Sequence, residues 1–163
     1  MKEITEEEML RKAAAYCAEA ERCRGDVEKK IARAGLEAEA AERILARLEK
    51  EGFINDERYC RFFVNDKLRF NKWGRMKIAL ELRKKDIPAA TYENALRNID
   101  EEEYILTLTQ LLRSKKRTTR GKDARECYYK LLRFAAGRGF EPALAGKCLR
   151  DILGGEDYEE NLD

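Results

Sequence analysis

The sequence predicts an all-α protein of three tandem three-helix repeats, stacked into an elongated, curved molecule. Three observations lead to this fold class. Apolar residues recur at helical spacing along almost the whole chain. Only 2 prolines and 10 glycines interrupt its 163 residues, and no segment shows the alternation of a strand. The pattern of residue classes also returns after about 50 residues, which is typical of stacked helical units.

The recurrence aligns five apolar positions in each of three copies. The copies are Val27, Ile31, Leu36, Leu45 and Leu48; Ile78, Leu82, Ile87, Leu96 and Ile99; and Leu131, Ala135, Phe140, Leu149 and Ile152. They predict repeats at residues 1–54, 55–99 and 100–153, followed by an acidic, mobile tail at 154–163.

In the first repeat, we expect helices at 5–22, 26–34 and 38–50. Thr5 and Glu8 have the spacing of a capping box. Gly35 and Gly52 stand where helices should end, because glycine tolerates the left-handed conformation found there.

The second and third repeats show the same signals. Asp56 opens the second repeat and Asp100 the third, where Glu103 repeats the capping spacing. Pro88 and Pro142 suit the first turn of the last helix of each repeat, where a missing N–H costs nothing. The expected helices are 56–70, 74–85, 89–98, 101–117, 122–136 and 142–153.

The composition excludes several classes of function. The chain has no histidine, which removes Ser-His-Asp and Cys-His catalysis and every histidine-containing zinc site. Its 5 cysteines form no CxxC pair, so we expect free thiols in a reducing cytosol. The acidic N-terminal residues do not resemble a signal peptide, and no apolar run approaches the ~18 residues of a membrane span. We therefore expect a cytoplasmic protein that is not an enzyme and needs no cofactor or metal.

Charge is distributed unevenly along the chain. Residues 1–57 carry 11 basic and 15 acidic side chains, whereas residues 58–150 carry 23 basic and 11 acidic ones. A basic block of this size can bind phosphate or an acidic protein surface, although it also occurs as an ordinary solvated face. The most basic stretch, 113–122, falls in an insertion that lengthens the third repeat.

These charges give a candidate partner-binding surface. It comprises Lys67, Arg69, Lys72, Trp73, Arg75, Arg113, Lys115, Lys116, Arg117, Arg120 and Lys122. Nearby, Tyr59, Phe63 and Phe70 fall near one helical stripe, which favours a place in the core over a stacking platform for nucleobases. Trp73, at a helix junction, is expected to be partly exposed.

The central repeat resembles the signature of the bacterial RecX family. The resemblance lies in residues 55–64, which read Asn-Asp-Glu-Arg-Tyr-Cys-Arg-Phe-Phe-Val, and in residues 74–87, which contain Gly74, Glu81-Leu82 and Ile87. The chain departs from the family pattern at Cys60, where alanine is usual, and at Asp86, where glycine is usual. The outer repeats match more weakly, and the resemblance covers about residues 10–153.

The resemblance implies a regulator of the RecA recombinase. Such proteins bind the RecA–DNA filament and restrain its growth, ATP hydrolysis, strand exchange and coprotease activity. The implied partners are the RecA filament and DNA, contacted weakly or through the filament, with the protein as a monomer. The residues alone leave open a stand-alone module for single-stranded nucleic acid and a helical adaptor that binds only protein.

Overall fold

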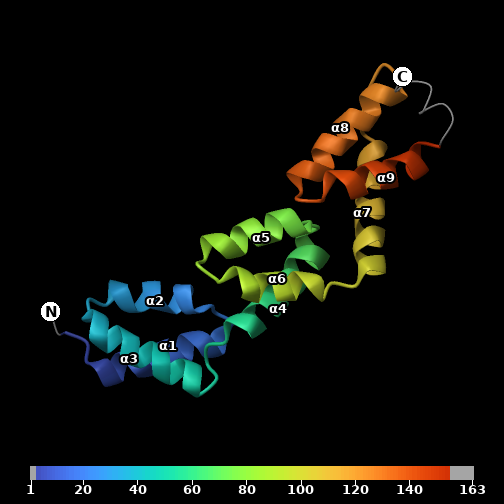
Figure 1. Cartoon of the computed structure of the whole chain (residues 1–163). Helices are drawn as coiled ribbons and strands as arrows, with labels where there is room; N and C mark the ends of the chain where they lie inside the picture. The colour runs from blue at the N-terminus through green and yellow to red at the C-terminus, as the bar shows by residue number, and fades with distance from the viewer. Residues whose placement is uncertain (1–2, 155–163) are drawn as a thin grey trace. The chain divides into compact units, whose positions relative to one another are not determined.

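The computed structural model describes residues 3–154 and is all-α over that range (Figure 1). It contains nine α-helices, one π-helical turn and no strand among these residues, which confirms the predicted helical-repeat fold. The predicted acidic tail lies, apart from Gly154, outside the described residues. The elements are α1 (Glu6–Glu19), α2 (Arg24–Arg33), α3 (Ala38–Lys50), α4 (Asp56–Asp66), η1 (Lys67–Asn71), α5 (Arg75–Lys84), α6 (Ala89–Arg97), α7 (Glu101–Lys116), α8 (Ala124–Gly137) and α9 (Pro142–Leu153).

The chain divides into two compact units that do not coincide with the three sequence repeats. Unit 1 comprises Met1–Phe63 and Leu82–Ala95, and unit 2 comprises Val64–Glu81 and Leu96–Asp163. All three α-helices of the middle repeat, α4, α5 and α6, therefore contribute residues to both units. The repeat boundaries themselves stay a prediction.

In unit 1, the helices α1, α2 and α3 pack against one another (Figure 1, blue to teal). Their amphipathic stripes meet in one apolar core, as a three-helix arrangement requires. The core residues are Met9, Ala13, Val27, Ile31, Ile44, Leu45, Leu48 and Ile54. At the start of α1, Thr5 and Glu8 form the predicted capping box.

In unit 2, the helices α7, α8 and α9 pack against one another (Figure 1, yellow to red), and η1 packs against α7. The largest fully buried side chains of this unit are Tyr104, Phe140, Ile78, Leu108, Leu112, Leu131 and Leu149. Asp100 caps α7 by accepting a hydrogen bond from the N–H of Glu103, as expected. Pro142 stands at the first position of α9.

The start of α5 is held by groups from the third repeat within unit 2. The N–H of Gly74 donates to the carbonyl of Arg138 at 2.8 Å, and the N–H of Met76 donates to the carbonyl of Gly139 at 2.9 Å. The N–H of Arg75 donates to the Tyr104 hydroxyl at 3.0 Å. Donors at a helix start have no partner inside the helix, so these acceptors satisfy them.

This contact requires glycine on both sides. A Cβ on Gly74 would lie 2.4 Å from the carbonyl oxygen of Gly139, and one on Gly139 would lie 2.3 Å from the Cβ of Lys77. Gly139 also has a φ of +92°, a conformation that favours glycine. Unit 2 is therefore closed by a backbone-to-backbone approach that no other residue permits.

The first helix, predicted to reach residue 22, already ends at Glu19. The helix predicted over 56–70 is present, but its type changes: the α-helix ends at Asp66 and continues as the π-helical turn η1, which ends at Asn71. A π-helical turn fits an extra residue into the helix, so the side chains beyond it rotate away from the stripe before it. Phe70 accordingly leaves the stripe that Tyr59 and Phe63 share, whose rings stack at 5.8 Å.

The five thiols are free, as predicted. Cys23, Cys60 and Cys148 are buried, and Cys17 and Cys127 are half-buried. Burial raises the pKa of Cys23 to about 11 and that of Cys60 to about 12. These two thiols are therefore protonated and unreactive at neutral pH.

A candidate partner-binding surface on unit 2

All eleven residues of the predicted surface fall in unit 2. Among the described residues, unit 2 carries 18 basic and 10 acidic side chains, whereas unit 1 carries 15 and 17. The net charge is thus +8 in unit 2 and −2 in unit 1. Basic residues from two separate segments of the sequence therefore belong to the same compact unit.

The first group of cations lies at the end of α7 and in the loop that follows it. Arg113, Lys115 and Lys116 occupy the last turn of α7, where cations complement the negative end of the helix dipole. The hydroxyls of Thr118 and Thr119 donate to the carbonyl of Lys115 at 3.1 and 2.7 Å. The N–H of Thr118 donates to the same carbonyl at 3.1 Å, so several donors converge on the end of α7.

The loop is ordered by further contacts with α8. The Lys130 ammonium donates to the carbonyl of Arg120 and forms an ion pair with Glu126 at 3.1 Å. The N–H of Lys122 reaches the same Glu126 carboxylate at 3.4 Å, and Asp123 caps α8. The pKa of Glu126 is lowered, and the hydrogen bond from Lys130 is the largest cause. The basic side chains of the last turn of α7 and of this loop are exposed while the backbone is held, and they are Arg113, Lys115, Lys116, Arg117, Arg120 and Lys122.

The second group lies on and after η1. Arg69 and Lys72 are exposed, and Lys72 adopts a left-handed conformation with a φ of +56°. Trp73 is half-buried, which confirms the expectation of partial exposure. The Lys67 and Lys77 ammonium groups lie 5.1 and 4.6 Å from its ring centroid, within the range of a cation–π interaction.

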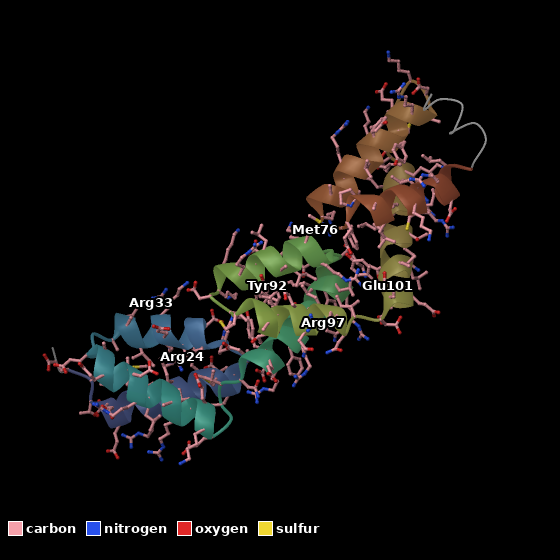
Figure 2. The ribbon with its side chains drawn as sticks, viewed as in Figure 1. Arg24, Arg33, Met76, Tyr92, Arg97 and Glu101 are labelled. Atoms are coloured by element: carbon pink, nitrogen blue, oxygen red, sulfur yellow. The ribbon has the colours of Figure 1, made fainter. Side chains whose placement is uncertain are left out.

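Arg75 is placed differently from the other ten residues. Its guanidinium forms ion pairs with Glu141, at 2.8 Å, and with Glu101, and it stacks on the Tyr104 ring at 3.9 Å. Figure 2 shows Glu101 at the start of α7 and the neighbouring Met76 at the start of α5. Burial opposes the charged form of Arg75, but the two carboxylates outweigh it and leave its pKa raised. Arg75 therefore holds helix starts together inside unit 2.

The Tyr104 hydroxyl completes this network. It accepts from the N–H of Arg75 and donates to the Glu141 carboxylate. Burial and that carboxylate raise the pKa of Tyr104 far above its ordinary value of 10.0. The hydroxyl keeps its proton at all physiological pH values, so the network stays intact.

Sequence reasoning missed the exposure of Phe70. Its side chain is 79% exposed, although its spacing from Phe63 favoured a buried stripe. A π-helical turn does not follow from the spacing of apolar residues, so that spacing could not predict η1 or the exposure of Phe70. Lys77 and Lys130 were missed too, although Lys77 is only four residues from the Trp73 ring that it covers; the contact of Lys130 with the carbonyl of Arg120 spans ten positions.

The described residues contain no cluster of three or more acidic or cysteine ligands that could hold a metal ion. No helix in this part of the chain is long and apolar enough to cross a membrane. What the described part offers is a tandem-helical fold with an exposed cationic surface, which is typical of a binding protein.

The comparisons with known proteins agree on one family. The family model described as "RecX, second three-helix domain" matches residues 55–96. Regulatory protein RecX from Streptomyces coelicolor is 33% identical over 123 residues, which are 74% of this chain and 65% of that protein. Regulatory protein RecX from Amycolatopsis mediterranei is 24% identical over 155 residues, covering 93% and 89% of the two chains.

Solved structures show the same fold. The crystal structure of RecX from Lactobacillus salivarius superposes with a TM-score of 0.81 at 19% identity, covering 90% of this chain and 96% of that one. A second crystal structure, of regulatory protein RecX, gives a TM-score of 0.78 at 22% identity over 90% and 73% of the chains. The chain therefore has the same class of fold, a tandem array of short helices. It belongs to the RecX family of regulatory proteins.

Proposed function

We propose that this protein binds the RecA–DNA filament and mainly inhibits the recombinase, ATPase and coprotease activities of RecA. It acts in DNA recombination, repair and the SOS response, as a cytoplasmic monomer that is not itself an enzyme. Membership of the RecX family supports the regulatory role. The observation that carries the proposal is the concentration of positive charge on unit 2, whose net charge is +8, whereas that of unit 1 is −2.

Charge of this kind suits a nucleoprotein filament. DNA presents phosphates, and long basic side chains neutralise them with release of counterions. The six cations at the end of α7 and in the loop after it are exposed on an ordered backbone, so binding a filament costs little loop ordering. Each phosphate contact on a single strand should lower the logarithm of the binding constant by about 0.7 for each tenfold rise in salt.

The test reverses charge in the loop. The triple variant Lys115→Glu, Lys116→Glu and Arg117→Glu should lose most of its inhibition of RecA's DNA-dependent ATP hydrolysis. The positions are exposed, so helical content measured by circular dichroism should stay near that of the parent protein. Lys115 also lies 5.2 Å from the Phe134 ring, so its loss costs a little stability.

A matched control places the same change in unit 1. The variant Arg11→Glu, Lys12→Glu and Lys29→Glu alters the net charge equally at exposed positions of α1 and α2. It should inhibit nearly as well as the parent protein. If the folded loop variant inhibits RecA at the same concentration as the parent protein does, these cations only face solvent and bind no partner.

A stand-alone module for single-stranded nucleic acid is the second candidate. The specific observation in its favour is the exposed Phe70 ring beside Arg69 and Lys72. Tight binding to naked single-stranded DNA, with no gain when RecA is present, would favour it. Binding to RecA without DNA, as tightly as to the filament, would favour the protein-only adaptor.

A further inference from the structure

Phe70 is the most exposed large apolar side chain in the described part of the chain, with 79% of its surface open. Phe62, on α4, follows with 57%. A phenylalanine exposed to this degree adds little to the stability of its unit and leaves a ring face open to a partner. The ring stands on η1, and π-helical turns occur frequently at functional sites.

The turn that carries Phe70 is fixed at both ends. Leu68 is buried and anchors it to unit 2. The carbonyl of Lys67 accepts the N–H groups of Lys72 and Trp73, the latter at 3.1 Å. The carbonyl of Asn71 accepts a hydrogen bond from the Arg138 guanidinium. The ring is therefore presented by an ordered turn, which reduces the entropy lost on binding.

Two cations lie close to Phe70 in the sequence: Arg69 precedes it on the same turn, and Lys72 ends that turn. Lys72 folds its ammonium back onto the carbonyl of Arg69, at 2.5 Å, so its charge stays over the last turn of η1. Arg69 is exposed, and its guanidinium lies 3.9 Å from the Glu103 carboxylate. That ion pair is exposed on both sides and stabilises little, so Arg69 can exchange it for a phosphate.

Trp73 is less suited to receive a partner than Phe70. Its ring is half-buried, and the Lys67 and Lys77 ammonium groups already lie over it. A nucleobase on that ring would have to displace these cations. The open aromatic face in this region belongs to Phe70.

We propose that Phe70 stacks on a nucleobase of single-stranded DNA while Arg69 and Lys72 bind the flanking phosphates. A base needs one open ring face and cations for its backbone, and this turn supplies both. An apolar protein anchor instead needs a surrounding that excludes water, whereas Phe70 is 79% exposed and its turn carries Arg69 and Lys72. The net charge of +8 on unit 2 complements a polyanion. The inference deepens the proposed function, on which it rests for the presence of DNA at this unit.

The experiment separates stacking from charge. Affinity is measured by fluorescence anisotropy for a labelled single-stranded thymidine oligonucleotide and for an abasic oligonucleotide of the same length. Phe70→Ala should weaken binding of the thymidine strand by about 5- to 100-fold. Binding of the abasic strand should stay within about twofold, because the phosphate contacts remain. Phe70→Trp should restore binding of the thymidine strand.

Phe62→Ala is the matched control, since it removes an exposed phenylalanine from α4. It should leave binding of both strands unchanged. Equal affinity of Phe70→Ala and the parent protein for the thymidine strand would overturn the inference. Equal losses on both strands would also overturn it, as would a parent protein that binds the abasic strand as tightly as the thymidine one.

This test and that of the proposed function can fail separately. The filament assay changes Lys115, Lys116 and Arg117 and measures ATP hydrolysis by RecA. The oligonucleotide assay changes Phe70 and contains no RecA. A loop variant that loses inhibition, together with a Phe70→Ala protein that binds normally, would overturn the stacking inference alone.

Discussion

The two units hold opposite ends of α5 by different means. In unit 2, its start is bound by backbone acceptors, and Gly74 meets Gly139 at a distance that excludes any Cβ. In unit 1, its end is bound by a side-chain ion pair, in which the Lys85 ammonium lies 3.0 Å from the Asp26 carboxylate. The helix α5 is thus fixed by steric fit at one end and by charge at the other. These attachments should respond differently to mutation and to pH.

The units also differ in how they use positive charge. In unit 1, Arg24 is bound by Glu42 and Glu49, and Arg43 by Glu6. In unit 2, Arg75 is bound in the same manner, but the loop after α7 presents its cations to solvent. A count of basic residues therefore does not identify a binding surface, because the carboxylate partners decide which cations remain available.

The largest expected effect comes from adding one methyl group to the backbone contact of unit 2. Gly74→Ala would place a Cβ 2.4 Å from a carbonyl oxygen and 2.5 Å from the N of Phe140. We expect a loss of roughly 2–4 kcal/mol in the free energy of unfolding, because backbone atoms on both sides must shift. Urea denaturation followed by circular dichroism measures it.

Two other glycine-to-alanine variants, one in unit 1 and one in α8, serve as comparisons for Gly74→Ala. Gly25→Ala would bring a Cβ to 2.9 Å from the carbonyl oxygen of Lys85, a milder clash that should cost less than Gly74→Ala. Gly137→Ala meets nothing within 4 Å and should stabilise α8 by about 0.5–1 kcal/mol. A Gly74→Ala protein as stable as the parent would refute the steric account of this attachment.

The ion pair of unit 1 predicts a pH dependence that the steric attachment lacks. Burial raises the pKa of Asp26, but hydrogen bonds with Lys85 and Cys23 outweigh it and leave the pKa below its ordinary 3.8. A carboxylate whose pKa is lower in the folded state stabilises the protein above its unfolded pKa. That contribution is lost as the pH falls through the folded value.

Asp26→Asn tests this sign. At neutral pH the variant should be less stable by about 1–2 kcal/mol, since it leaves Lys85 without its half-buried partner. The difference from the parent should shrink as the pH falls below about 4. Glu28→Gln, at an exposed position of the same helix, should change stability by less than about 0.5 kcal/mol at every pH. A constant penalty for Asp26→Asn across the acid range would contradict the assignment.

The smallest effects come from two residues in the left-handed region, one in each unit. Lys72 has a φ of +56° and Asp86 a φ of +60°. Glycine relieves the strain but adds freedom to the unfolded chain, so the net gain should be below about 1 kcal/mol. Lys72→Gly should gain more than Asp86→Gly, because aspartate tolerates this conformation better than lysine. Thermal unfolding of both variants measures the order, and a larger gain for Asp86→Gly would contradict it.

Local signals in the sequence predicted much of the fold. Gly35 and Gly52 have the positive φ expected of residues that end helices, and Thr5 and Asp100 cap helices as predicted. The RecX pattern usually has glycine at position 86. The left-handed φ of Asp86 explains that preference. Each of these features depends on the chemistry of residues within a few positions, which a sequence displays directly.

The rest depended on contacts between distant residues. Arg75 belongs to the basic segment by sequence, yet Glu141, 66 positions away, draws it into an internal ion pair. The exposure of Phe70 results from a π-helical turn held by Leu68 and Arg138, which apolar spacing does not encode. The basic loop was predicted as a surface, but its order depends on Lys130 from the next helix.

We propose that the protein recognises RecA and DNA together in the assembled filament. The most direct measurement compares the affinity of the labelled protein for three partners in one buffer: naked single-stranded DNA, RecA alone, and RecA assembled on that DNA. We predict the tightest binding to the filament, with weaker binding to either component. Affinity for naked DNA or for RecA alone that equals affinity for the filament would contradict the claim.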